Sequence, residues 1–222
     1  VLASSAISSN KILLRVKFKQ GAKITWKVEG IYNPAYTPKK FSFAIELDVL
    51  CAKVMQGGKK ALIKYNLKKY TVNGNQMNQA IKEMALILDN RGFIKKRIKN
   101  ISPQFRSRIQ FPNYPVGPGD IWNSEIHFKM TPFLYNMNVK VRFDKYINYK
   151  GRKCILLSAR GQGDNYRYNR YKVKAVSISK YIYDIKSTII LKTEATKIYY
   201  RKINGKWILT ATVKSKLKPI NV

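Results

Sequence analysis

The sequence predicts a mainly β protein built on an antiparallel sheet with little helix. Three observations carry this prediction. Apolar and polar residues alternate with a period of two along most of the chain, glycine-containing turn signals separate the alternating stretches, and only one stretch has a helical pattern. Alternation places every second side chain on the same face, as in the half-buried strands of an antiparallel sheet.

The alternation is clearest in three stretches. Residues 11–19 alternate apolar with mostly basic side chains, residues 138–144 do the same, and residues 212–218 set a lysine at every second position. We expect each stretch to be a strand with one buried and one solvated face. The one helix candidate covers residues 75–85, and its C-terminal end also fits a strand.

Turn signals predict where strands reverse. Asn-Gly between two alternating runs is the strongest short hairpin signal, because both residues readily adopt a positive φ. The predicted turns are Asp89 to Gly92, Asn204 with Gly205, Gly57 with Gly58, and Lys150 with Gly151.

The chain divides into two strand-rich halves around a Pro/Gly-rich linker. The predicted parts are an N-terminal segment after a signal peptide (1–10), a first half (11–110), the linker (111–120) and a second half (121–222), with the halves forming one domain or two. Each half has a tryptophan followed at nearly the same distance by an aspartate that opens a hairpin, Trp26 with Asp89 and Trp122 with Asp184. This spacing fits a weak internal duplication, or the even spacing of any all-β chain.

The linker resembles a segment of a known class of proteins. Residues 111–122 read FPNYPVGPGDIW, which resembles the Pro…Pro-Val-x-x-Gly-Asp-x-Trp segment of bacterial envelope proteins of unknown function with a LolA/LppX-like fold, the fold of lipoprotein and lipid carriers. Residues 151–155, 181–184 and 188–190 match later strands of that pattern. The resemblance implies an exported protein with a strongly curved, half-barrel or sandwich-like antiparallel sheet, which in the carriers cradles acyl chains against helices. This chain has fewer helical signals and far more positive charge.

Positive charge dominates the composition. The chain of 222 residues has 44 Lys and Arg against 11 Asp and Glu, a formal net charge of +33. Such a density costs stability through self-repulsion, which an anionic partner relieves. The candidates are nucleic acid, an anionic lipid or lipopolysaccharide surface, and an acidic polysaccharide. An AT-rich genome would also enrich lysine, but it would not make acidic residues scarce.

The basic residues lie at every second position, so those of one strand share a sheet face. The candidate polyanion-binding residues in this pattern are Arg15, Lys17, Lys19, Lys95, Arg97, Lys99, Lys140, Arg142, Lys172, Lys174, Lys214, Lys216 and Lys218. Together they predict a basic sheet face, whereas each group taken alone also fits the solvated side of a strand.

The stretch 160–174 interleaves arginine with tyrosine. Arginine forks match phosphate oxygens and tyrosine stacks on bases or sugars. Its candidate residues are Arg160, Tyr166, Arg167, Tyr168, Arg170, Tyr171, Lys172 and Lys174. The alternative is a polar hairpin in a tyrosine-rich protein.

Catalytic and cofactor motifs are missing from the sequence. His127 is the sole histidine, and there is no Gly-x-Ser-x-Gly elbow, phosphate loop or dinucleotide fingerprint. We therefore expect a protein that is not an enzyme and that uses no cofactor or metal.

Two cysteines and the N-terminal residues bear on the compartment. Cys51 and Cys154 would pair in an oxidising compartment or remain two buried thiols, and the sequence fits both. Residues 1–6 read VLASSA, like the end of a signal peptide or a mature N-terminus just past it, and no window is apolar enough to span a membrane. We expect an exported, periplasmic or extracellular protein.

The leading functional hypothesis is sequence-independent binding or coating of a polyanion, most favourably nucleic acid, by a basic sheet face, with several copies as a homo-oligomer or filament. A periplasmic lipid or lipoprotein carrier of LolA/LppX-like type is one alternative. A structural envelope subunit that docks lipopolysaccharide or an acidic partner is the other.

Overall fold

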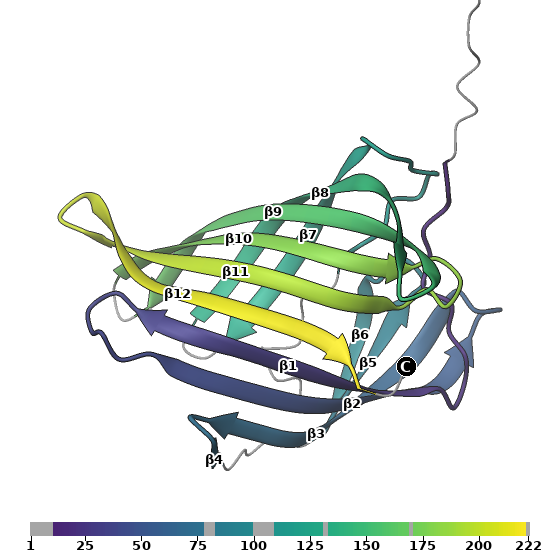
Figure 1. The fold of residues 1–222 in the computed structure, drawn as a ribbon, viewed down its shortest axis with the longest axis horizontal. Helices are drawn as coiled ribbons and strands as arrows, with labels where there is room; N and C mark the ends of the chain where they lie inside the picture. The colour runs from purple at the N-terminus through teal and green to yellow at the C-terminus, as the bar shows by residue number, and fades with distance from the viewer. Residues whose placement is uncertain (1–10, 78–82, 100–108, 131–132, 169–170, 221–222) are drawn as a thin grey trace, which may run out of the picture.

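The computed structural model describes residues 11–77, 83–99, 109–130, 133–168 and 171–220. Within these ranges every regular element is a strand, and all of them join one antiparallel sheet. The sheet curls so strongly that its edge strands come behind its central ones (Figure 1). The predicted fold class, mainly β with a strongly curved antiparallel sheet, is confirmed.

The strands follow one another mostly as a meander. Their bounds are β1 Lys23–Pro34, β2 Phe41–Met55, β3 Lys60–Val72, β4 Asn75–Gln76, β5 Glu83–Asp89, β6 Ile94–Lys99, β7 Ile121–Met130, β8 Phe133–Tyr149, β9 Arg152–Tyr168, β10 Tyr171–Asp184, β11 Ile190–Ile203 and β12 Lys206–Pro219. The order across the sheet is β6-β5-β3-β2-β1-β12-β11-β10-β9-β8-β7, with β4 paired to β3. The first and last long strands, β1 and β12, therefore pair at the centre, and β6 and β7 are the two edges.

The predicted hairpin turns are confirmed. Asn204 and Gly205 join β11 to β12 with φ values of 47° and 80°, the pair of positive angles that a type I′ turn requires. Lys150 and Gly151 join β8 to β9 in the same way, with φ values of 53° and 74°. The turns after β2 and β5 also lie where the glycines predict them.

Two local predictions are wrong. Residues 11–19 form no strand, and their only bridge joins Ile12 to Val116. Their alternation reflects packing of Leu14 and its apolar neighbours into the core rather than pairing in the sheet. The helix candidate at 75–85 begins as β4 and ends in β5, and residues 78–82 lie outside the described part.

The core consists of two apolar clusters on one face of the sheet, which we call the concave face. The larger cluster covers β8 to β10 and includes Val141, Phe143, Ile155 and Leu157, each at most 1% exposed. The smaller cluster lies on β2, β3 and β5 around Leu88. The opposite face, which we call the convex face, carries the alternate residues of the same strands.

Two irregular segments, residues 11–20 and 109–120, connect the two ends of the curled sheet; we call them the closing segments. They bond to each other through Ile12 and Val116, with N···O distances of 2.8 and 2.9 Å. Phe111 and Val116 are buried in the larger cluster, so the segment expected as a linker contributes to the core. The Tyr183 hydroxyl of β10 donates to the Arg15 carbonyl at 2.8 Å, which fixes the first segment against the second half of the sheet.

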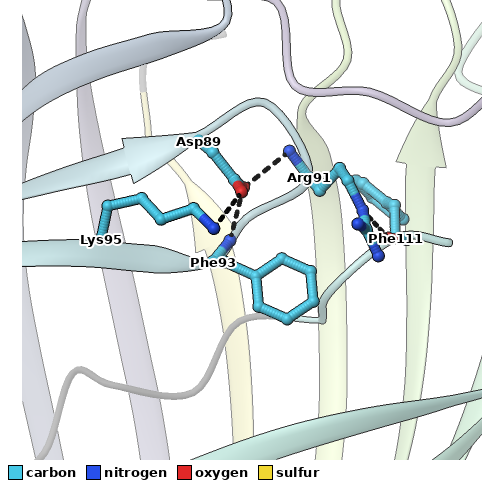
Figure 2. A network of polar contacts seen from close by, with 5 residues as sticks. All are labelled: Asp89, Arg91, Phe93, Lys95 and Phe111. Carbon is cyan, nitrogen blue, oxygen red and sulfur yellow. Dashed lines mark hydrogen bonds and ion pairs between the residues drawn. The ribbon is translucent and has the colours of Figure 1, made fainter. Parts of the chain in front are cut away.

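The turn between β5 and β6 binds the same segments (Figure 2). The Asp89 carboxylate accepts the backbone N–H groups of Arg91 and Phe93 at 3.0 and 2.9 Å and pairs with Lys95 at 3.2 Å. The Arg91 side chain and backbone then exchange two hydrogen bonds with the backbone of Phe111, both of 2.9 Å. One edge of the sheet is thereby tied to the closing segment that leads to the opposite edge.

Candidate functional site

The convex face carries the largest group of predicted basic residues. Strand register places eight of them on this face of β8, β9, β10 and β12: Lys140, Arg142, Arg160, Lys172, Lys174, Lys214, Lys216 and Lys218. These eight side chains therefore share one face of the sheet, and their role in binding a polyanion stays a prediction.

Some of these cations lie directly opposite one another. Lys140 pairs in register with Arg160, and Lys218 with Lys27. Like charges at opposed positions of neighbouring strands destabilise a sheet, because their side chains are only about 5 Å apart at the base. Lys27 already forms an ion pair with Glu29 at 2.7 Å. Of the two pairs, Lys140 with Arg160 is therefore the one where an added anion would relieve more repulsion.

Acidic residues lie among the cations at the centre of the convex face. Glu29 pairs with Lys27 at 2.7 Å, and Glu194 pairs with Lys192 at 3.0 Å. A hydrogen bond from the neighbouring lysine lowers the pKa of each of these two carboxyl groups. Exposed pairs of this kind contribute little to stability, but they reduce the positive charge at the centre of the face.

The predicted residues Arg15, Lys17 and Lys19 lie elsewhere, because residues 11–20 are a closing segment and not a strand. The Arg15 guanidinium donates to the carbonyl oxygens of Leu14 and Pro112 at 2.6 and 2.7 Å. Burial and the nearby Arg91 lower the pKa of Arg15. The Arg15 side chain therefore joins the two closing segments to each other. Its prediction as part of a basic sheet face is wrong.

The other predicted groups are separated as well. Lys95, Arg97 and Lys99 lie on β6, at the edge opposite to β7 and β8, and Lys95 is engaged by Asp89. The backbone of Tyr166, Arg167, Tyr168 and Tyr171 belongs to the β9–β10 hairpin. Their side chains, and Arg170 altogether, lie outside the described part.

The centre of the concave face is a second candidate site, which the sequence analysis did not identify. Between the two core clusters, β1, β2, β11 and β12 present apolar side chains that are only half-buried. These are Trp26, Val28, Tyr32, Phe41, Phe43, Val213 and Leu217. Gly30 lets the Phe43 ring lie directly on the backbone of β1, since a Cβ at this position would come within 2.4 Å of the ring.

One lysine lies on this apolar surface. Lys197 of β11 pairs in register with Ser177 and Val213, which places it on the concave face. It is half-buried, and burial lowers its pKa to about 8. The signal in the sequence is a lysine at an inward position of an alternating strand, between Ala195 and Tyr199.

Cys51 and Cys154 are both buried and both have free thiols. Burial raises the pKa of both thiols. In the described ranges, no group of three His, Cys, Asp or Glu side chains is arranged to hold a metal ion, and no helix is long and apolar enough to cross a membrane.

No protein family and no curated protein matches this sequence. Among solved structures, the chain is similar to a putative outer membrane lipoprotein-sorting protein domain from Vibrio parahaemolyticus. The identity is 13%, the alignment covers 92% of this chain and 88% of that chain, and the TM-score is 0.22. The likeness is coarse.

Proposed function

We propose that this protein is a non-catalytic carrier that holds an amphiphile with an acyl chain and an anionic head group on its concave face. The observation that carries the proposal is the pairing of a half-buried apolar surface at the centre of the concave face with Lys197. The sequence contains no catalytic motif. The lack of enzymatic activity and the export to the periplasm or the extracellular space stay predictions.

The apolar part of the surface would hold the chain. Aromatic side chains such as Trp26 and Phe43 are only half-buried, although they face the same side as the core. An acyl chain laid along them would remove apolar area from water on both partners, which contributes about 0.8 kcal/mol for each buried CH₂.

Lys197 would hold the head group. Its ammonium group is charged at neutral pH, but burial disfavours that charge. A carboxylate or phosphate beside it would favour the charged form and would itself be bound in surroundings of low dielectric constant. A neutral head group would gain no such interaction, so the site should prefer anionic amphiphiles.

The test combines identification with binding. Mass spectrometry of protein purified without detergent should find an acyl-chain lipid, and laurate should displace a fluorescent fatty acid. K197M should weaken laurate binding about tenfold, as loss of one buried charge contact of about 1.4 kcal/mol implies. Dodecanol should bind both proteins equally.

The matched control is K214M, which removes a lysine from the convex face one strand away, next to Thr196. It should bind laurate like the unmodified protein. Mass spectra that show no bound lipid, together with no laurate binding, would refute the carrier proposal. Equal laurate affinity of K197M and K214M would refute the role of Lys197.

The opposed cations of the convex face favour a second candidate, the sequence-independent binding of a polyanion. Replacing Lys140 and Arg160 with glutamine would remove one such pair. Affinity for double-stranded DNA should then fall, and the slope of log K against log salt should decrease by about 0.9 for each lost phosphate contact. Lipopolysaccharide and single-stranded DNA should be titrated in the same way for comparison. An affinity that does not change with salt concentration would exclude this candidate function.

A further inference from the structure

The hairpin between β11 and β12 extends beyond the rest of the sheet. Pairing of β10 with β11 ends at Arg201, and pairing of β1 with β12 ends at Ala211. Residues 202–210, which we call the hairpin tip, therefore pair as strand only within their own two-stranded ribbon. Figure 1 shows this tip, in yellow, projecting past the neighbouring strands.

The hairpin tip exposes large apolar side chains. Trp207, Ile208 and Leu209 are 41%, 47% and 44% exposed, and Ile203 is 36% exposed. Consecutive residues of a strand point to opposite faces, so both faces of the ribbon are apolar and neither is covered within the described structure. A run of three exposed apolar residues is unfavourable unless it binds something.

The ribbon is held in a defined shape. Lys202 pairs with Trp207 and Ile203 with Lys206 across the Asn204–Gly205 turn. At the base, the Thr210 hydroxyl donates to the Tyr199 carbonyl at 3.0 Å. The tip therefore presents its apolar groups on a short hydrogen-bonded ribbon rather than on an irregular loop.

Cations surround these apolar groups. Lys202 Nζ lies 5.9 Å from the centre of the Trp207 ring, and Lys206 is the other exposed cation of the tip. The neighbouring β1–β2 loop adds Lys39, Lys40 and Tyr36, of which Tyr36 is 81% exposed. The Ala35 N–H donates to the Thr210 carbonyl at 2.9 Å, which ties this loop to the base of the hairpin tip. Residues 35–40 and 201–210 contain no acidic side chain.

We propose that the hairpin tip docks the protein on an anionic lipid bilayer, with Trp207, Ile208 and Leu209 in the interface and the lysines on the head groups. Tryptophan favours the boundary between head groups and acyl chains. Basic residues near an anionic bilayer each contribute about 1 kcal/mol, and apolar side chains add to that. A nucleic acid would use the lysines and Trp207 but would leave Ile208 and Leu209 exposed to water.

The apolar groups on both faces of the ribbon favour a bilayer over a protein. A flat protein partner would cover one face of a two-stranded ribbon and leave the other in water. A lipid interface closes around an inserted tip and covers both faces at once. The inference does not rest on the carrier proposal, because it uses neither Lys197 nor the concave face.

The experiment measures flotation of the whole protein with two kinds of vesicle, phosphatidylcholine alone and phosphatidylcholine with 30% phosphatidylglycerol. Binding should be strong only to the second. The variant I208S/L209S should bind those vesicles at least tenfold more weakly, which corresponds to about 1.4 kcal/mol. K202Q/K206Q should lose most of the preference for phosphatidylglycerol.

The matched control is I31S/I178S, which removes two isoleucines of the convex face that are 48% and 47% exposed. It should bind vesicles like the unmodified protein, and the urea midpoints of the variants should show that all are folded. Equal vesicle binding by I208S/L209S and the control would overturn the proposal. So would a dimer in solution that I208S/L209S dissociates, because the tip would then dock a second copy.

Discussion

Replacing Lys197 with methionine should stabilise the protein at neutral pH. The side chain lies on the concave face in register with Ser177 and Val213, and burial lowers its pKa from 10.5 to about 8. Each tenfold change in proton affinity corresponds to 1.36 kcal/mol, so the charge costs up to about 3 kcal/mol. Because the side chain is only half-buried, we expect K197M to gain about 1–2 kcal/mol.

The gain should depend on pH with a definite sign. Below pH 8 both the folded and the unfolded chain hold the proton, so the cost of the buried charge is present in full. Between pH 8 and about 10.5 only the unfolded chain holds it, so the stability of the unmodified protein rises with pH. The advantage of K197M should therefore shrink across this window.

Urea unfolding of K197M, K214M and the unmodified protein at pH 7, 9 and 10.5 measures this effect. K214M carries the same change of net charge on the convex face, so it corrects for the repulsion among the remaining cations. If K197M were no more stable than K214M at pH 7, or if its advantage did not fall towards pH 10.5, the argument from burial would be refuted.

Three further predictions concern the rest of the fold. Phe111→Ala should lower the free energy of unfolding in urea by about 3–5 kcal/mol, because removing this buried ring, whose centre lies 5.3 Å from that of Tyr183, leaves a cavity. A loss below 1 kcal/mol would show that the closing segment is dispensable for stability. Burial would raise the pKa of Asp184, but hydrogen bonds from Ser187, the Lys186 backbone and Arg152 outweigh it and lower that pKa. The stability that the Asp184 carboxylate contributes is present above the pKa of the unfolded state and is lost as the pH falls through the pKa of the folded state. Urea unfolding midpoints should therefore fall less steeply from pH 5 to pH 3 in D184N than in the unmodified protein. Parallel curves of midpoint against pH would contradict this. Gly161→Ala should cost about 1–3 kcal/mol of unfolding free energy by overpacking, because its Cβ would lie 2.6 Å from the Met137 sulfur. In the M137A background the same substitution should cost less. Additive losses of unfolding free energy for the two changes would argue against the contact.

The hairpins show how far local sequence determines this structure. The Asn204–Gly205 turn is predictable because the two residues that tolerate positive φ stand between two alternating runs. The backbone preferences of these two residues are enough to determine the turn type. The helix candidate at 75–85 fails for the opposite reason. Its residues fit a helix locally, but pairing of Glu83 to Asp89 with β3 completes the sheet and overrides that preference.

The candidate sites depend on information that is not local. Alternation places Lys140 and Lys214 on a face, but only strand order shows that both belong to the same convex face. The same alternation along residues 11–19 suits a strand and a buried extended segment equally well. Arg15 therefore joins the closing segments, where its guanidinium bonds to backbone carbonyls.

The sequence by itself determined the all-β class, the hairpin turns and the excess of positive charge, because these follow from the period of side chains along a strand, from backbone preferences at glycine and asparagine, and from composition. The tertiary structure alone decided which cations share the convex face, that Lys197 turns towards the apolar concave face, and that the hairpin tip extends beyond its neighbours. These features depend on which strands pair and where their pairing ends, and long-range contacts between distant parts of the chain set both.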